Sequence, residues 1–380
     1  MFDAIIIGAG PGGGLAAVRL AEAGAKILIL EKEKLPRDKA CGGVLTTTPV
    51  KAMLDWDFSA VVEAEIGACR CQFDFGRTIN TRYETLVLCV NRRDFDCHII
   101  EHALSRGAVT LREGFPVAHV EEHGEGVTVV GKDGERYHAR YLVGADGATG
   151  RTAAALGLGR RTQVGVAIDA EIEVSPETWT EEAGRMSFNF GCVRGGYGWI
   201  FPKNGYLSCG IASWSGEVRL PPALDAYLSR ALPPNSIRGQ KRRGHPIPIY
   251  EGPKRISTRR SCLVGDAAGL VDPIMGEGIR FALQSGAIAA EVIVEQLAGV
   301  AAPDDGLEYT RRVHAVFGAS LERLRKFILP IFLKSPDTFY RNFHEHGRSY
   351  SALAGALDAQ FYPGGGAFAA APASQRSIQS

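Results

Sequence analysis

The chain has 380 residues, of which 45% are hydrophobic and 22% are charged, and its formal net charge is +1. This composition is typical of a soluble globular protein, and a charge balance near zero gives no argument for nucleic-acid binding. The sequence has no window of about 18 uninterrupted apolar residues, so we expect no transmembrane helix. The length suits two joined domains better than a single core.

The N-terminus leads directly into a predicted strand. It carries the acidic Asp3 and lacks the basic segment and cleavage site of a signal peptide, so we expect a cytoplasmic protein. The eight cysteines form no C-x-x-C pair and no Cys/His cluster with zinc spacing, which predicts no metal site. Cys69 and Cys71 alternate within a predicted strand and should share one of its faces.

The stretch from residue 3 to residue 31 predicts a strand, a glycine turn, a helix and a second strand, in the order of a dinucleotide-binding unit. Three glycines match the G-x-G-x-x-G fingerprint, namely Gly8, Gly10 and Gly13. Glu31 closes the second strand, where a carboxylate accepts hydrogen bonds from a ribose 2′-OH and repels a 2′-phosphate. We therefore expect an ADP-ribosyl site that favours FAD or NAD over NADP.

The nucleotide-binding pattern is interrupted farther along the chain. Residues 86–114 predict strand, helix and strand, residues 120–144 predict a meander, and residues 164–249 are rich in strands and aromatic side chains. We therefore expect an α/β fold with four parts. These are a discontinuous Rossmann-like domain (residues 1–68, 91–158 and 255–300), an inserted, mainly antiparallel β-sheet substrate domain (69–90 and 159–254), a helical C-terminal region (301–360) and a disordered tail (361–380).

Two further turns bear on the choice between FAD and NAD. Asp146 lies between glycines at the end of a buried strand, and Asp266 lies in a similar turn after a later strand. A carboxylate in such a turn can bind a ribitol hydroxyl, although strand-to-helix junctions favour Gly and Asp in any case. Together with the first glycine turn, these two turns favour an extended FAD that runs across one interrupted fold.

Several motifs identify a family resemblance. Those that resemble the flavoprotein hydroxylase superfamily, with its glutathione-reductase-type FAD fold, are GAGPGG at 8–13, RxxFD at 92–96, GADG at 144–147 and GDAAGLxDP at 265–273. Those that resemble the geranylgeranyl reductase family of FAD-dependent oxidoreductases are KACGG at 39–43, YGWIFPKNGYLSCG at 197–210 and PIMGEGIRFALQSG at 273–286. The motifs span most of the chain, and they imply that the cofactor is FAD.

The resemblance also implies roles for individual residues. The glycine turn and Glu31 would bind the ADP half of FAD, Arg92 would lie against its phosphates or ring, and Asp266 would contact its ribitol and pyrophosphate. The loop that passes the isoalloxazine ring would comprise Gly276, Gly278 and Ile279. A backbone N–H and a helix dipole there would support negative charge on the reduced ring. Residues 148–150, Ala-Thr-Gly, depart from the more usual serine-containing turn.

The substrate side is predicted from an aromatic strand and one cysteine. Tyr197, Trp199 and Phe201 alternate and should lie on one sheet face. The resemblance implies that they line a substrate cavity, and the alternative is that they form plain core. It also places Cys41 near the flavin edge, where its thiol would shape the cavity or relay a proton. The alternative for Cys41 is a buried apolar thiol.

The resemblance therefore implies an enzyme, an FAD-dependent reductase that saturates carbon–carbon double bonds of a polyprenyl lipid by hydride transfer from reduced flavin. A flavin-dependent aromatic monooxygenase, a halogenase-like enzyme and a non-catalytic FAD electron carrier are the alternatives. The motif YGWIFP is similar to the halogenase pattern W-x-W-x-I-P, but Tyr197 replaces its first tryptophan. No second dinucleotide fingerprint is present, so the electron donor could be NAD(P)H or ferredoxin.

A segment near the C-terminus suggests peripheral contact with the inner face of a membrane. Residues 321–343 hold basic residues on both sides of an apolar run around Pro330, namely Phe327, Ile328, Leu329, Ile331, Phe332 and Leu333. Such a run is too short to span a bilayer but could enter the interface, with its cations at the headgroups. The alternative is a helix whose apolar face packs on the substrate domain.

Overall fold

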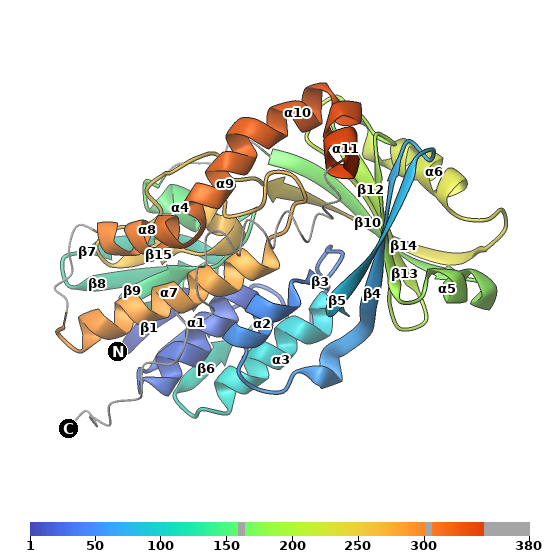
Figure 1. Cartoon of the computed structure of the whole chain (residues 1–380). Helices are drawn as coiled ribbons and strands as arrows, with labels where there is room; N and C mark the ends of the chain where they lie inside the picture. The colour runs from blue at the N-terminus through green and yellow to red at the C-terminus, as the bar shows by residue number, and fades with distance from the viewer. Residues whose placement is uncertain (159–163, 301–305, 346–380) are drawn as a thin grey trace.

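The computed structural model describes residues 1–158, 164–300 and 306–345. These residues form two β-sheets that stand side by side, with most helices packed on the first sheet (Figure 1). The C-terminal helices run along the top of this view, from the first sheet to the second.

The first sheet has seven strands in the order β6-β2-β1-β9-β8-β7, with β15 paired to β9. The strands are β1 (Phe2–Ile7), β2 (Ile27–Leu30), β6 (Val109–Arg112), β7 (Val117–His123), β8 (Gly126–Gly131), β9 (Arg136–Gly144) and β15 (Ser261–Leu263). β6, β2, β1, β9 and β15 are parallel, and β9, β8 and β7 form the predicted antiparallel meander. β2 is buried along its whole length, because helices and the meander cover both faces of this sheet.

Helices bring their N-termini to the carboxyl ends of the parallel strands. The helices of this domain are α1 (Pro11–Glu22), α2 (Thr47–Met53), α3 (Arg92–Leu104), α4 (Thr152–Ala155) and α7 (Ile279–Leu297), with short 3-10 turns η1 (Ser59–Val61) and η2 (Gly265–Ala268). α1 and α7 pack closely, since a Cβ atom on Gly286 would lie 2.3 Å from the Gly12 carbonyl oxygen. Both helices therefore begin beside the same space, where nucleotides bind in folds of this type.

The second sheet has eight strands in the order β14-β10-β13-β12-β11-β4-β5-β3. The strands are β3 (Val44–Leu45), β4 (Val62–Phe73), β5 (Thr78–Val90), β10 (Val164–Val174), β11 (Arg185–Phe190), β12 (Gly196–Pro202), β13 (Leu207–Ser213) and β14 (Ile237–Pro248). β11 and β4 are parallel and the other pairs are antiparallel, which confirms the expected fold class. Helices α5 (Pro176–Glu182) and α6 (Leu220–Ala231) belong to this domain.

The second sheet begins earlier in the chain than we expected. The boundary drawn between residues 68 and 69 falls inside β4, and the even earlier β3 also pairs into this sheet. The reason is nonlocal, because β4 is held by parallel pairing to β11 more than a hundred residues later. The whole of β4 therefore belongs to the second sheet.

The C-terminal helices join the two domains. They are α8 (Leu307–Val313), the π-helical turn η3 (His314–Gly318), α9 (Ala319–Arg323), the π-helical turn η4 (Leu324–Ile328), α10 (Leu329–Lys334) and α11 (Pro336–Glu345). Tyr309 and Phe317 pack into the core of the first domain, and Leu324 and Phe332 pack into the core of the second. The predicted tail, 361–380, lies outside the described residues.

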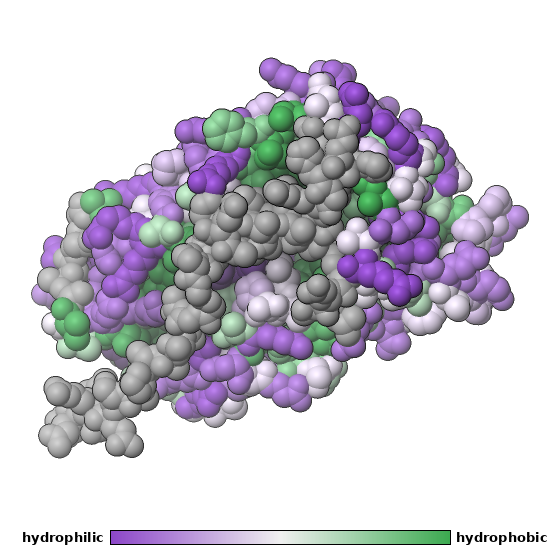
Figure 2. Space-filling model, viewed as in Figure 1, coloured by the Kyte–Doolittle hydropathy of each residue, from purple (hydrophilic) through white to green (hydrophobic). Residues whose placement is uncertain are grey.

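The apolar run around Pro330 divides between core and surface. Leu329 and Phe332 are buried, whereas Phe327 is 65% exposed and Leu333 is 39% exposed. On the face seen in Figure 2, small hydrophobic patches lie among hydrophilic residues, and one is at the top, where α10 lies in Figure 1. Within the described ranges, every helix is too short or too polar to cross a membrane.

Candidate active site

A cavity of about 1280 Å³ lies between the two sheets, and every site residue predicted from the sequence lines it. One side consists of the turns after β1, β2, β9 and β15 and the start of α7. The other side is a face of the second sheet. The turns that we expect to bind the cofactor and the aromatic strand therefore open onto one space.

The glycine turn leaves an open path to the start of α1. Gly8 has a φ of +107°, which favours glycine, and a Cβ atom on Gly13 would lie 2.2 Å from the Gly8 carbonyl oxygen. Gly10 is different, because among the described residues only a guanidinium nitrogen of Arg37, at 3.8 Å, lies within 4 Å of its missing Cβ. A pyrophosphate could approach over Gly10 to reach the free N–H groups of α1, with Arg37 beside it.

Glu31 is fixed at the end of β2 by several donors. The residue is 3% exposed, and its carboxylate accepts hydrogen bonds from the N–H groups of Ala9 at 2.8 Å and Glu33 at 3.1 Å. Arg37 adds an ion pair at 3.3 Å. A carboxylate held so firmly at the cavity wall suits the ribose contact expected of it.

Arg92 is a buried and paired cation. It is 9% exposed, and Asp96 binds its guanidinium at 2.7 and 2.8 Å. Burial lowers the pKa of Arg92, but Asp96 and then Cys41, which accepts a hydrogen bond from the guanidinium, raise it above the ordinary value. Asp96 also binds Arg37 at 3.1 Å. These groups link the ADP-binding turn to the Cys41 loop.

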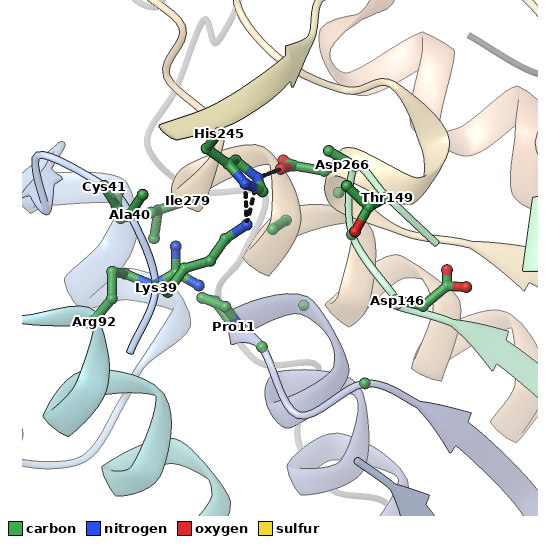
Figure 3. Close-up of a pocket in the computed structure, with 18 of the residues that line it drawn as sticks. Pro11, Lys39, Ala40, Cys41, Arg92, Asp146, Thr149, His245, Asp266 and Ile279 are labelled. Carbon is green, nitrogen blue, oxygen red and sulfur yellow. Dashed lines mark hydrogen bonds and ion pairs between the residues drawn. The ribbon is translucent and has the colours of Figure 1, made fainter. Parts of the chain in front are cut away.

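Lys39, His245 and Asp266 meet in the cavity from three distant parts of the chain (Figure 3). The Lys39 ammonium lies within hydrogen-bond distance of the His245 ring, and His245 Nε2 lies 4.0 Å from Asp266 Oδ2. Burial, opposed by Asp266, lowers the pKa of Lys39 to about 8. Burial and the Lys39 charge lower the pKa of His245 to about 3, so the imidazole is neutral and accepts the hydrogen bond. Within the described ranges, Lys39 has no carboxylate within ion-pair distance, which suits an anionic ligand.

The two predicted carboxylates differ in how they are held. One oxygen of Asp146 accepts hydrogen bonds from the N–H groups of Arg151 and Thr152 at the start of α4. Its other oxygen, Oδ1, is buried without a partner among the described residues. Asp266 lies beside the start of α7, with Oδ1 3.1 Å from the place of a Cβ atom on Gly278.

The aromatic strand forms a continuous wall. Tyr197, Trp199 and Phe201 share one face of β12 and one core cluster, as the alternation predicted. The Tyr197 hydroxyl donates to the carbonyl of Met275, in the loop that we expect at the isoalloxazine ring. A Cβ atom on Gly42 would lie 2.7 Å from the Phe201 ring, so the loop that holds Cys41 lies directly on this wall.

Comparison with known proteins shows the family to which this chain belongs. Residues 1–204 match the model of the FAD binding domain family. The chain belongs to this family, and its cofactor is FAD.

The relatives include two named reductases and one uncharacterized protein. An uncharacterized protein of Methanosarcina barkeri is 33% identical over 77% of this chain and 74% of its own length. The chloroplastic geranylgeranyl diphosphate reductase of Arabidopsis thaliana is 31% identical over 76% of this chain and 65% of its own length. The menaquinone reductase of Mycobacterium tuberculosis is 29% identical over 77% of this chain and 76% of its own length. These matches confirm the resemblance to geranylgeranyl reductases.

Solved structures agree on the fold. A geranylgeranyl bacteriochlorophyll reductase-like protein of Thermoplasma acidophilum superposes with a TM-score of 0.79 at 23% identity, over 95% of this chain and 96% of its own. The halogenase PltM gives a TM-score of 0.68 at 16% identity, over 87% and 77%. At these identities the likeness establishes the architecture and leaves the reaction to the residues of the site.

Sequence reasoning missed four residues that line the cavity, namely Arg37, Lys39, Asp169 and His245. Arg37 and Lys39 both precede Cys41 in the stretch PRDKAC, and Lys39 is the first residue of the KACGG motif, so their closeness to Cys41 was a usable signal. His245 follows a run of basic residues on β14 that resembles an ordinary solvated strand. Asp169 is a single acid in an alternating strand and carries no sequence signal of its own.

Proposed function

We propose that this protein is an FAD-dependent reductase that saturates carbon–carbon double bonds in a polyprenyl, geranylgeranyl-type lipid. The observation that carries the proposal is the division of the cavity, whose cofactor-binding turns face an aromatic wall built from Tyr197, Trp199 and Phe201. A hydrocarbon chain gains free energy from burial against such a wall, at about 25 cal/mol per Å² of apolar surface. The sequence similarity to geranylgeranyl diphosphate reductase also favours a prenyl-lipid reductase.

The protein's contribution is orientation and the exclusion of water. Bound and reduced, FAD supplies a hydride. Glu31, Asp146 and the start of α1 would hold its ADP half and ribitol, and Gly276, Gly278 and Ile279 would support the ring. The hydrogen bond from Tyr197 to the Met275 carbonyl ties the aromatic wall to the loop expected at the isoalloxazine ring. This bond would hold the substrate at a fixed distance from the ring.

Two further features belong to the proposal. The electron donor is NAD(P)H or ferredoxin, which would reach the flavin transiently. The prenyl substrate would enter from a membrane surface, met by the exposed part of the run around Pro330 at the inner face. The halogenase architecture is shared, but Tyr197 in place of the first tryptophan of the halogenase pattern favours reduction.

The test is an anaerobic assay of the purified FAD protein. After chemical reduction of the flavin, geranylgeranyl diphosphate, a geranylgeranyl glycerol ether lipid and menaquinone are added separately, and products are analysed by mass. Gains in steps of two hydrogen atoms together with flavin reoxidation support the proposal. Rapid oxygen consumption with hydroxylated or halogenated product would favour the monooxygenase or halogenase, and slow reoxidation without product would favour an electron carrier.

A further inference from the structure

Asp169 and Trp199 lie on either side of Gly210 on the face of the second sheet that lines the cavity. Asp169 of β10 and Trp199 of β12 both pair with Gly210 of β13. Paired residues project from the same face of a sheet, so both side chains reach the cavity. A Cβ atom on Gly210 would lie 2.2 Å from Cζ2 of Trp199, so the indole covers this glycine, beside the strand that holds Asp169.

The Asp169 carboxyl group is buried, and within residues 1–158, 164–300 and 306–345 it has no ion pair. The residue is 6% exposed, and its Oδ1 accepts a hydrogen bond of 2.8 Å from the Ser208 hydroxyl. Burial raises the pKa of Asp169 to about 6, against the opposing effects of the Ser208 bond and the Lys203 charge. The group therefore keeps a proton at a pH where an exposed aspartate has lost it.

Three charged groups face Asp169, namely Glu171 on β10, Arg243 on β14 and Lys203 after β12. Each has another partner. Arg243 binds Glu171 at 2.9 Å and Asp38 at 2.7 Å, and Lys203 donates to a backbone carbonyl 2.7 Å away. The side chains of Arg243 and Glu171 are 19% and 33% exposed. Asp169 thus lies between the closed aromatic part of the cavity and a polar mouth that water reaches.

Two other proton carriers on this side of the cavity already donate to acceptors within the protein. The Tyr197 hydroxyl donates to a backbone carbonyl, and burial raises its pKa above the ordinary value. The Lys39 ammonium donates to a histidine ring. Asp169 has a protonatable oxygen that no described residue occupies.

We propose that Asp169 is the acid that delivers a proton to the double bond of the substrate, an inference that rests on the reductase function proposed above. The double bond takes a hydride from reduced FAD at one carbon and the Asp169 proton at the other. The carboxyl O–H bond breaks as the second C–H bond forms, which leaves a carboxylate and oxidised FAD. Water at the mouth beside Arg243 then returns a proton to the carboxylate.

The first experiment follows one turnover without an electron donor. Wild type and Asp169→Asn are loaded with FAD, reduced anaerobically and mixed with the prenyl lipid that the wild type reduces. Asn keeps the size of the side chain and an acceptor for Ser208, so flavin content and lipid affinity should change less than threefold. Flavin reoxidation should slow about 100-fold or more, because a positioned general acid contributes 10²–10⁴-fold. Asp169→Glu should recover part of the rate.

The pH profile and an infrared measurement separate proton delivery from a structural role. The wild-type rate should fall as pH rises through about 6, and the residual Asp169→Asn rate should lack this step. A carboxylic-acid infrared band of the FAD protein should titrate over the same range and be absent in Asp169→Asn. The matched control is Glu173→Gln, an exposed carboxylate on the same strand outside the cavity, which should react at the wild-type rate.

Failure of this proposal is distinguishable from failure of the reductase function. If the wild type reduces no prenyl lipid, the reductase function is wrong and the proton proposal falls with it. If the wild type turns over and Asp169→Asn matches it within threefold with the same pH profile, Asp169 is not the acid and the reductase function stands. Absence of the infrared band at pH 5 would also overturn the proposal.

Discussion

Arg92 holds both carboxylate oxygens of Asp96, with Nε 2.7 Å from Oδ1 and Nη2 2.8 Å from Oδ2. The two residues are one helical turn apart on α3, at the start of the helix that leads away from the cavity. Asp96 is 1% exposed and also binds Arg37, which in turn pairs with Glu31. One buried carboxylate therefore fixes two cations along the wall that we assign to FAD.

Replacing Asp96 should destabilise the protein strongly. Asp96→Asn would leave the buried Arg92 and the nearby Arg37 without their shared counter-charge, which costs about 3–5 kcal/mol for a buried pair. The measurement is urea unfolding at an FAD concentration that saturates both proteins. The control is Asp225→Asn, whose partner Arg242 lies 2.5 Å away in a pair that is 61% exposed at the aspartate. Asp225→Asn should lower the free energy of unfolding by less than about 1 kcal/mol. Equal decreases for the two variants would contradict the stabilising role that we assign to Asp96.

A valine in place of Gly10 should abolish FAD binding and leave the fold intact. Of the described side chains, only the end of Arg37 reaches the space over Gly10, so the new methyl groups would fill the path of the pyrophosphate. Gly13 is a poorer target, because its Cβ would collide with the Gly8 carbonyl and disturb α1 itself. Flavin absorbance and circular dichroism should show folded, colourless Gly10→Val. Gly216→Val should stay yellow, because apart from its chain neighbours no described residue has an atom within 4 Å of the added Cβ.

FAD affinity should fall as pH rises above about 8. In the FAD-free protein burial lowers the pKa of Lys39 to about 8, so its positive charge is present below that pH and lost above it. The anionic cofactor binds more tightly to the protein whose Lys39 is charged, and binding therefore raises the pKa of Lys39. Each unit of that rise corresponds to about a tenfold difference in FAD affinity between the charged and neutral forms. Lys39→Met should bind FAD more weakly at pH 7 and show no change up to pH 9. Lys51→Met, on the exposed side of α2, should behave as wild type, and a flat wild-type profile would count against Lys39.

The cofactor side could be predicted because its signals are contiguous. The turn from Gly8 to Gly13 and the acid at Glu31 lie within one β-α-β unit, so local order fixed their relation in space. The same holds for the aromatic face of β12, which follows from alternation alone. Arg92 was predicted as a site residue, but its partner Asp96 was not assigned, although helix spacing places the two side chains together.

The remaining features depend on pairings that a single sequence does not reveal. Lys39 and His245 are 206 residues apart and meet only because β14 forms the edge of the second sheet over the cavity. Asp169 and Trp199 project from the same face of the second sheet because β10 and β12 pair with the same residue of β13. A shift of one residue in either register would turn one of these side chains to the other face of the sheet.

The exposed part of the run around Pro330 should bind anionic membranes. Phe327 is 65% exposed and Leu333 is 39% exposed, and the exposed Lys326 and Lys334 flank them, whereas Phe332 is buried in the second core. The informative variant is therefore Phe327→Glu/Leu333→Glu, since changing Phe332 would disturb the fold. Wild type should co-sediment with vesicles of anionic phospholipid at low salt, where the attraction of its cations is least screened. The double variant should lose most of this binding while it keeps its flavin.

The control is Val300→Glu, which alters an apolar side chain that is 79% exposed on another part of the surface, and it should sediment as wild type does. Wild-type protein that stays in the supernatant at low salt would remove the membrane contact and leave delivery of the lipid to a carrier.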